Sequence, residues 1–376
     1  MRFRPALAVW LLVALLTCCR SAPEPGPAPG ASSTSSASSA PPRSALAAPH
    51  VTAEPRKIER KDKAMGTTLH FIAFTNADVD EQQTHAAIDA AIAEMRRLEA
   101  RLSEWRADSD VGRVNAGAGD WVAVGAEALE VIERGLDAGR LSNGTFDITF
   151  QAMSEVWKFG SAQDAKPTIP PRSEIAKRRA LVDYRKVELD LRGSRVRLPR
   201  GHAIGLGGIA KGYIVDRAAA VLRGAKLRAF LVQAGGDLYG AGRKPDGSRW
   251  VSGIQDPRGP QGTFFASLEL EDRAFSTAGD YARSYVVGRR RYHHIIDPRT
   301  GYPATASRSV TVWAKDATTA DVVDDAVFIL GPEQGLKLAD SLDGVGVVIV
   351  DAKNEIWTSR ELRGRVRLLK PPTDGI

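Results

Sequence analysis

Two local patterns meet in the stretch Arg291-Tyr292-His293-His294-Ile295-Ile296-Asp297-Pro298-Arg299-Thr300-Gly301-Tyr302-Pro303. Residues 292–296 are aromatic and β-branched, which predicts a strand. Residues 297–301 have a turn pattern, because proline restricts φ and glycine tolerates a positive φ. Neighbouring side chains of a strand point to opposite faces, so one histidine can be structural while the other faces a cleft. The simpler interpretation is a β-hairpin with a half-buried histidine.

The composition of the chain is typical of a globular protein. Its 376 residues can bury a substantial core in one large domain or two smaller ones. Hydrophobic residues make up 43% and charged residues 26%, both ordinary values. The formal net charge of +7 is mild for this length, and no Lys/Arg block with interleaved aromatic residues occurs. We therefore expect no binding to nucleic acid.

Residues 1–19 have the pattern of a bacterial lipoprotein signal peptide. Two arginines precede an apolar run, residues 6–16, that is too short to span a bilayer. The run leads into Thr17-Cys18-Cys19, and a signal peptide that closes on cysteine resembles a lipoprotein box. Cys19 is favoured over Cys18 as the acylated residue, because a small residue precedes it. The alternatives are an ordinary cleaved signal peptide and a tail anchor in reverse.

The signal peptide is followed by residues 20–55, which are rich in Ala, Ser and Pro and nearly free of large apolar side chains. Such a segment cannot bury enough surface to fold, which predicts a disordered tether with a reach of roughly 30 Å. Cys18 and Cys19 are the only cysteines, so the remainder of the chain has no disulfide or thiolate metal site. We expect a periplasmic protein with a lipid at Cys19 (or Cys18) in the inner membrane, the outer membrane being the alternative.

The predicted folded body, residues 56–376, alternates helix and strand patterns. Apolar residues at helical spacing predict helices at 81–102, 125–141 and 318–330, and another that follows a Gly-rich turn and continues to 222. Shorter runs predict strands at 69–74, where apolar residues alternate, at 187–191 and 195–198, which form a hairpin, and at 229–232, 250–254, 264–270, 274–277, 309–313, 345–350 and 355–358.

The Gly-rich turn is Ile204-Gly205-Leu206-Gly207-Gly208-Ile209-Ala210-Lys211-Gly212-Tyr213. A turn of this kind exposes backbone N–H groups and the positive end of the helix dipole, and Lys211 adds a movable cation. These groups suit a diphosphate. The spacing matches neither GxxxxGK[ST] nor GxGxxG, so the P-loop and Rossmann interpretations fail. The alternative is a tight packing turn between a strand and a helix.

The helix predicted after Trp313 contains a group of acids. Asp321 and Asp325 are four residues apart and share a helical face, with Asp324 close by. Two carboxylates on one face suit Mg²⁺, which binds one or two carboxylates together with phosphate and water. The alternative is a solvated acid cluster stabilised by the helix dipole.

Seven short motifs occur in the order seen in the ApbE family, which this sequence resembles from about residue 63 to 360. They are Met65-Gly66-Thr67, Ser103-Glu104-Trp105, Gly144-Thr145-Phe146-Asp147, Gly207-Gly208-Ile209-Ala210-Lys211-Gly212, Ala234-Gly235-Gly236-Asp237, the stretch from His294 to Pro303, and Ala320-Asp321. The resemblance implies an α+β fold of the T-fold-like ApbE type, with mixed or antiparallel sheets and packed helices. It also implies FAD as substrate, Mg²⁺, and a flavin-acceptor protein that receives FMN on a Thr or Ser while AMP is released.

The resemblance also implies roles for particular residues. His294 and Asp321 would be catalytic, and the carbonyl of Gly208 would hold the metal with Asp321 and Asp325. The FAD site would be lined by Met65, Trp105, Thr145, Phe146, Asp147, Lys211 and Ile296. The sequence departs from the family pattern at three positions: Gly205 replaces Asp, Ala278 replaces Ser, and Asp325 replaces Thr.

The chemistry of these residues fits attack on a phosphoanhydride. Mg²⁺ and Lys211 would neutralise the phosphoryl oxygens, and His294 or a helix acid would accept the proton of the attacking hydroxyl. The same groups would also serve an FAD pyrophosphatase, which forms FMN and AMP without a protein acceptor. The third possibility is a flavin-binding lipoprotein without catalytic activity. The presence of both Asp321 and Asp325 argues against it.

Overall fold

The computed structural model describes residues 54–159 and 168–375. The expected signal peptide and all but the last two residues of the expected tether lie outside these ranges, so both stay predictions. Within the described residues, no helix combines the length and the apolar character that crossing a membrane requires.

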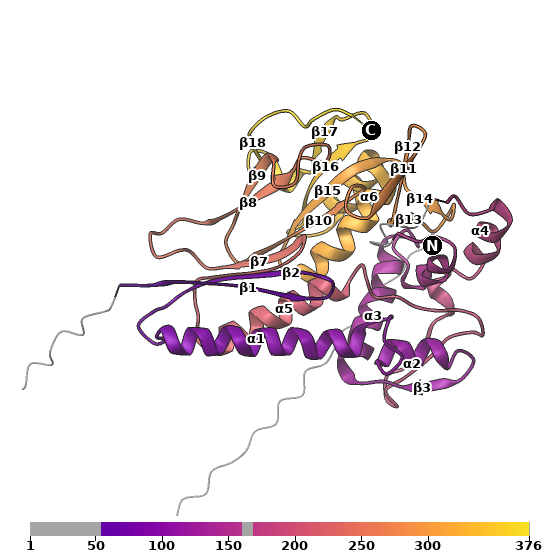
Figure 1. Ribbon diagram of the computed structural model, residues 1–376, viewed down its shortest axis with the longest axis horizontal. Helices are drawn as coiled ribbons and strands as arrows, with labels where there is room; N and C mark the ends of the chain where they lie inside the picture. Colours follow the sequence, from indigo (N-terminus) through magenta and orange to yellow (C-terminus); the bar gives the residue numbers. More distant parts are fainter. Residues whose placement is uncertain (1–53, 160–167, 376) are drawn as a thin grey trace, which may run out of the picture. The chain divides into compact units, whose positions relative to one another are not determined.

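An eight-stranded sheet is the centre of the folded body (Figure 1). Each strand is antiparallel to its neighbours. In spatial order the strands are β1 (Lys57–Ala64), β2 (Thr67–Phe74), β6 (Phe230–Ala234), β7 (Asp237–Ala241), β10 (Arg273–Gly279), β15 (Ser307–Ala314), β16 (Gly346–Asp351) and β17 (Ile356–Thr358).

Three long helices cover one face of this sheet: α1 (Glu81–Leu102), α5 (Ala210–Gly224) and α6 (Ala317–Ser341). In α1 the buried residues recur every three or four positions, which gives the helix one apolar stripe. Its first turn is closed by a capping box between Asp80 and Gln83. The stripe packs with apolar residues of α5, α6 and the sheet into the larger core.

A second, smaller core lies on the other face of the central sheet. Here a three-stranded sheet packs, made of β8 (Trp250–Gln255), β9 (Phe264–Leu270) and β18 (Arg367–Leu368). Phe275 and Trp313 of the central sheet contribute to this core, whereas the alternate residues Val310 and Val312 belong to the larger one. The period-two alternation of strands therefore assigns neighbouring residues to different cores.

The remaining elements are short except for one helix of 16 residues, Ala126–Leu141. They are α2 (Asp110–Ala116), β3 (Trp121–Ala123), α3 (Ala126–Leu141), η1 (Ile148–Glu155), α4 (Arg172–Arg179), η2 (Tyr184–Lys186), β4 (Glu188–Asp190), β5 (Arg195–Arg197), β11 (Ser284–Val287), β12 (Arg290–His293), β13 (Ile296–Asp297), β14 (Tyr302–Pro303) and η3 (Arg360–Leu362). Antiparallel pairing joins β11 to β12, β13 to β14, and β5 to both β3 and β4.

Most predicted elements are confirmed, including the α+β class, the helix at 81–102 and the strand at 264–270. The single strand predicted at 292–296 is wrong. The chain forms β12 up to His293, pairs it with β11, and then begins β13, which pairs with β14 across the turn. The predicted turn itself is confirmed, because Gly301 has φ of 76° and its N–H donates to the carbonyl of Asp297 at 2.8 Å.

The helix predicted to end at residue 330 ends there, and a further helical segment follows after a kink. Gly331 has φ of 75° and ψ of −176°, a conformation accessible to glycine, and Pro332 starts the next helical segment to Ser341. The strand predicted at 229–232 is β6, which extends to Ala234, and β7 begins at Asp237 after a turn at Gly235 and Gly236. The prediction of β2 from residue 69 also missed its partner β1, whose residues alternate exposed and buried.

Replacement of Gly331 by Ala should lower the free energy of unfolding by about 1–3 kcal/mol. The added Cβ would lie 2.7 Å from Cβ of Ala306, and the backbone conformation itself disfavours any side chain. Gly224→Ala is the matched control, because open space surrounds that position. Urea unfolding of both variants measures the difference; equal stabilities would show that the kink does not depend on glycine.

Candidate functional site

The first turn of α5 and the loop before it pack against α6, with one glycine of each facing an aspartate. A methyl group added at Gly212 would lie 2.8 Å from Cβ of Asp321, and one added at Gly208 would lie 2.7 Å from Oδ2 of Asp325. Only glycine leaves room for this approach. The backbone N–H of Gly212 uses it to donate to Oδ2 of Asp321 at 2.9 Å.

Lys211 connects three elements of the larger core. Its Nζ lies 2.7 Å from Oδ2 of Asp237, the first residue of β7, and 3.1 Å from Oδ1 of Asp321 on α6. Both aspartate side chains are buried, whereas Lys211 keeps 31% of its side-chain surface exposed. Burial alone would lower the pKa of Lys211, but the two carboxylates outweigh it and raise the pKa well above its usual value. Lys211 is therefore a permanent cation at the rim of a buried acidic cluster.

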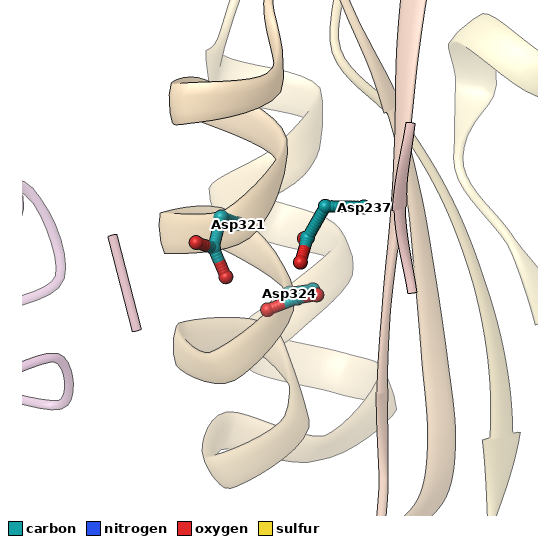
Figure 2. Close-up of side chains that lie close together, drawn as sticks. All are labelled: Asp237, Asp321 and Asp324. Atoms are coloured by element: carbon teal, nitrogen blue, oxygen red, sulfur yellow. The ribbon is translucent and has the colours of Figure 1, made fainter. Parts of the chain in front are cut away.

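Three carboxylates converge in this cluster: Asp237, Asp321 and Asp324 (Figure 2). Asp321 and Asp324 project from α6 toward Asp237, and one oxygen of each lies within 4.8 Å of the others. Oγ of Ser276 lies 2.5 Å from Asp237 and 2.6 Å from Asp324. A hydroxyl donates only one hydrogen bond, so Ser276 cannot donate to both carboxylates at once.

The acids of α6 hold their protons more strongly than isolated aspartates do. Burial, reinforced by Asp237, raises the pKa of Asp321 to about 7. Burial also raises the pKa of Asp325 to about 6, and that of Asp324 well above its usual value, with the neighbouring carboxylates adding to the effect. The cluster has more negative charge than Lys211 can balance.

The donor set fits a small divalent cation. Every side-chain donor is a carboxylate oxygen, the ligand type that Mg²⁺ prefers. A cation would also relieve the excess negative charge that raises these pKa values. Asp237 and Asp324 join Asp321 here, whereas the predicted ligands Gly208 and Asp325 lie together one helical turn away.

The two adjacent histidines have different environments. His293 is buried, its Nε2 lies 2.8 Å from the carbonyl of Ala304, and its Nδ1 accepts from the N–H of Ile295 at 3.3 Å. With both nitrogens engaged, His293 is structural. In His294 the buried Nδ1 has no hydrogen-bond partner among the described residues. Burial, followed by the positive charge of Arg283, lowers the pKa of His294 to about 3, so the imidazole is neutral.

Some of the residues expected to line a flavin site lie together with the acids, and others lie apart. The ring of Phe146 lies against Gly208, since a methyl group there would be 3.0 Å from Cε2. Trp105 is 74% exposed, and Met65 occupies the turn between β1 and β2 with φ of 52°. Ile296 packs in a separate cluster with Met153, Trp157, Ile175 and Tyr292.

Thr145 and Asp147 are buried in the segment between α3 and η1. Both oxygens of Asp147 serve the chain itself: Oδ1 accepts from the N–H of Thr149 at 2.8 Å, and Oδ2 from the N–H of Tyr184 at 2.9 Å. Asp147 thus supports the segment that carries Phe146. The contacts of these residues with FAD stay predictions.

Sequence reasoning did not include Asp237 and Arg283 among the site residues. Asp237 follows Gly235-Gly236, and its position as an acid at the start of a buried strand could have identified it as a site residue. The carbonyl of Arg283 accepts from the N–H of His294 at 3.2 Å, and no local pattern indicated that contact. At Gly205, where the family has Asp, an added Cβ would lie 2.7 Å from Oε1 of Gln151, so Gln151 occupies that space.

A model of the ApbE family matches residues 65–349. The chain belongs to the ApbE family. An FAD:protein FMN transferase of Treponema pallidum is 30% identical over 331 residues, which are 84% of this chain and 90% of the relative.

Solved ApbE structures have the same fold. The ApbE protein of Thermotoga maritima is 32% identical with a TM-score of 0.75, covering 82% of this chain and 99% of that one. The flavin transferase ApbE of Vibrio cholerae is 25% identical with a TM-score of 0.71, covering 83% and 99%. The T-fold-like ApbE architecture expected from the sequence is confirmed.

Binding of Mg²⁺ to the acidic cluster should strengthen as the pH rises. Bound carboxylates must be deprotonated, so below the Asp321 pKa of about 7 the affinity should fall about tenfold for each pH unit. The raised pKa also means that the folded chain binds protons more tightly than the unfolded chain. Without metal, its stability should therefore decrease as the pH rises from about 4 to about 7.

Calorimetric Mg²⁺ titration and thermal unfolding across this pH range measure both effects. Asp89→Asn removes an exposed acid that pairs with Arg60 and should leave the pH dependence unchanged. Asp237→Asn should weaken Mg²⁺ binding. An affinity independent of pH in the unmodified chain would contradict a metal site at these carboxylates.

Proposed function

We propose that this chain is an Mg²⁺-dependent FAD:protein FMN transferase that attaches FMN to a Thr or Ser of an acceptor protein and releases AMP. The observation that carries the proposal is the contact of Lys211 with a buried carboxylate cluster beside the N-terminus of α5. The similarity to an FAD:protein FMN transferase of Treponema pallidum supports it.

The reaction breaks the phosphoanhydride bond of FAD and forms a phosphoester bond to the acceptor. The acceptor oxygen attacks the phosphorus on the FMN side of the FAD diphosphate, and the bond from that phosphorus to the AMP oxygen breaks. The hydroxyl proton passes to a base, and AMP leaves with the electron pair of the broken bond. Negative charge grows on the phosphoryl and leaving oxygens, so cations aimed at them lower the barrier.

The residues of the site would divide this work. Lys211 would contact the diphosphate from the first turn of α5, near the positive end of the helix dipole. The N–H groups of Ala210 and Gly212 are already bonded to Leu206 and Asp321, so the lysine is the donor that this turn offers. Asp321 would hold the metal with Asp237 and Asp324 or with Asp325 and the Gly208 carbonyl. Bound there, Mg²⁺ would supply charge neutralisation at the phosphoryl oxygens.

His294 would be the base that accepts the proton of the attacking hydroxyl. Its neutral imidazole has a free ring nitrogen, so it can accept a hydrogen bond. A pKa of about 3 makes it a weak base in the free protein. An anionic diphosphate nearby would favour the protonated form and raise that pKa, which would match the base to the reaction.

AMP release should depend on the acceptor, because a transferase must keep water from the phosphorus until the hydroxyl is in place. With FAD and Mg²⁺ alone, release should be slow. A candidate acceptor domain with a free Thr or Ser should increase it and gain the mass of FMN minus water. Chromatography of AMP and mass spectrometry of the acceptor measure these outcomes. Equal AMP release with and without acceptor, and no mass shift, would identify an FAD pyrophosphatase.

The same assay tests His294. His294→Gln should lower the transfer rate by about 10²–10⁴-fold, the usual contribution of a general base, with a much smaller effect on FAD affinity. His202→Gln is the matched control, because His202 is also a buried histidine with an unpartnered ring nitrogen. If both variants behave alike, the effect is one of folding and His294 has no special part.

We also propose that the chain is a periplasmic lipoprotein anchored at Cys19. Replacement of both Cys18 and Cys19 by Ser should release it into the soluble fraction, because the acyl chains provide most of the membrane affinity. Cys18→Ser alone should stay anchored. Fractionation followed by a high-salt wash distinguishes these outcomes; a double variant that still sediments with membranes would contradict the anchor.

A further inference from the structure

A basic and apolar segment near the C-terminus is exposed. Residues 363–370 read Arg-Gly-Arg-Val-Arg-Leu-Leu-Lys and contain no acid. All four cations are exposed, and the side chains of Leu368 and Leu369 are 60% and 52% exposed. We call this segment the basic patch. Two adjacent exposed leucines among cations are unusual on a surface that meets only water.

The fold holds the basic patch in place. Arg367 and Leu368 form β18 and pair with Ser267 and Ala266 of β9. The N–H groups of Leu369 and Lys370 donate to the carbonyl of Phe265 at 2.8 and 3.2 Å. Further along, Oγ1 of Thr373 donates to the buried carboxylate of Asp256 at 2.7 Å. The two leucines are thus presented by paired backbone.

A cavity of about 500 Å³ lies beside the basic patch. Arg249, Arg273, Arg365 and Arg367 line it together with Trp313, Glu269 and Glu271. The guanidinium groups of Arg273 and Arg365 lie 4.7 and 5.3 Å from the centroid of the Trp313 ring.

Positive charge in this region exceeds negative charge. Glu271 pairs with Arg243 and Arg249, and Glu269 also pairs with Arg249. Within the basic patch, Arg365 pairs with Glu361 and Lys370 pairs with Asp256. Among the described residues, Arg273, Arg363 and Arg367 form no ion pair, and the buried Nε of Arg273 has no hydrogen-bond partner. Guanidinium groups without carboxylate partners are suited to phosphate.

The basic patch lies on the opposite side of the central sheet from the acidic cluster. Ser276 points toward Asp324 on α6, while its neighbour Phe275 belongs to the core beneath β8 and β9. Trp313 belongs to that same core. The patch is therefore separate from the flavin site, and its role does not rest on flavin transfer.

We propose that the basic patch binds the folded body to an anionic phospholipid surface. The free arginines would take the headgroup phosphates, and Leu368 and Leu369 would enter the boundary between headgroups and acyl chains. Cations beside apolar side chains match this interface, because the cations can contact the headgroup phosphates while the apolar side chains contact the acyl chains. An acidic protein would satisfy the arginines, but the exposed leucines favour the lipid.

The test uses the chain from Thr52 onward, which is a compact unit by itself and lacks the expected anchor. It should sediment with vesicles of phosphatidylcholine and phosphatidylglycerol, but not with phosphatidylcholine alone, and added salt should reverse the binding. Each cation near an anionic surface strengthens binding about fivefold, so Arg363→Gln with Arg367→Gln should weaken it roughly 25-fold. Leu369→Ser should weaken it severalfold.

Matched controls come from the hairpin of β4 and β5 and its neighbourhood. Lys186→Gln with Arg192→Gln removes the same charge from exposed positions, and Leu191→Ser alters a leucine that is 53% exposed. These variants should bind vesicles as the unmodified chain does. Equal binding to both lipid mixtures, no binding to either, or equal losses in patch and control variants would overturn the proposal. Thermal unfolding verifies that each variant is folded.

Discussion

The contact of one lysine with two buried aspartates holds the functional half of this fold together. Lys211 belongs to α5, Asp321 to α6 and Asp237 to β7, so a single ammonium group connects two helices to the central sheet. Asp216 strengthens the same junction, because its carboxylate accepts from the N–H groups of Ala317 and Thr318 at 2.7 and 2.8 Å. Burying several charges is costly, and breaking such a network costs more than the network contributes. A buried network of this kind is therefore better explained by a binding function than by a contribution to stability.

The fold could be predicted from the sequence where a local pattern and its burial agree. The apolar stripe of α1 and the mostly buried, apolar run of β9 are strong signals, and both elements were predicted with the bounds that the structure has. The single strand predicted across His294 is wrong, because β propensity depends on local sequence whereas strand pairing depends on distant residues. The residues up to His293 pair with β11, and Ile296 and Asp297 pair with β14. The helix predicted to end at residue 330 does end there, because Gly331 leaves the helical conformation, and the segment from Pro332 to Ser341 was not predicted.

The candidate site was predicted in part for the same reason. Asp321, Asp325 and Lys211 stand beside recognisable helix starts, which makes their exposure to a common space a reasonable expectation. Asp237 reaches that space only through the antiparallel pairing of β7 with β6 and β10. Its contact with Lys211 and its position near Asp321 depend on residues far away in the chain, so no spacing within the sequence predicts them. The different partners of His293 and His294 are also a product of tertiary packing.

The pairing of β2 with β6 has a consequence for how the chain reaches this structure. Leu69 lies opposite Ala234, and helices α1 to α5 occupy the chain between them. The last strand of the sheet, β17, ends at Thr358. Long-range pairings of this kind form slowly, because the entropy of closing a large loop is lost before the contacts are gained. The eight-stranded sheet can therefore be complete only after residue 358 has been synthesised, whereas hairpins such as β1 with β2 can form from neighbouring residues alone.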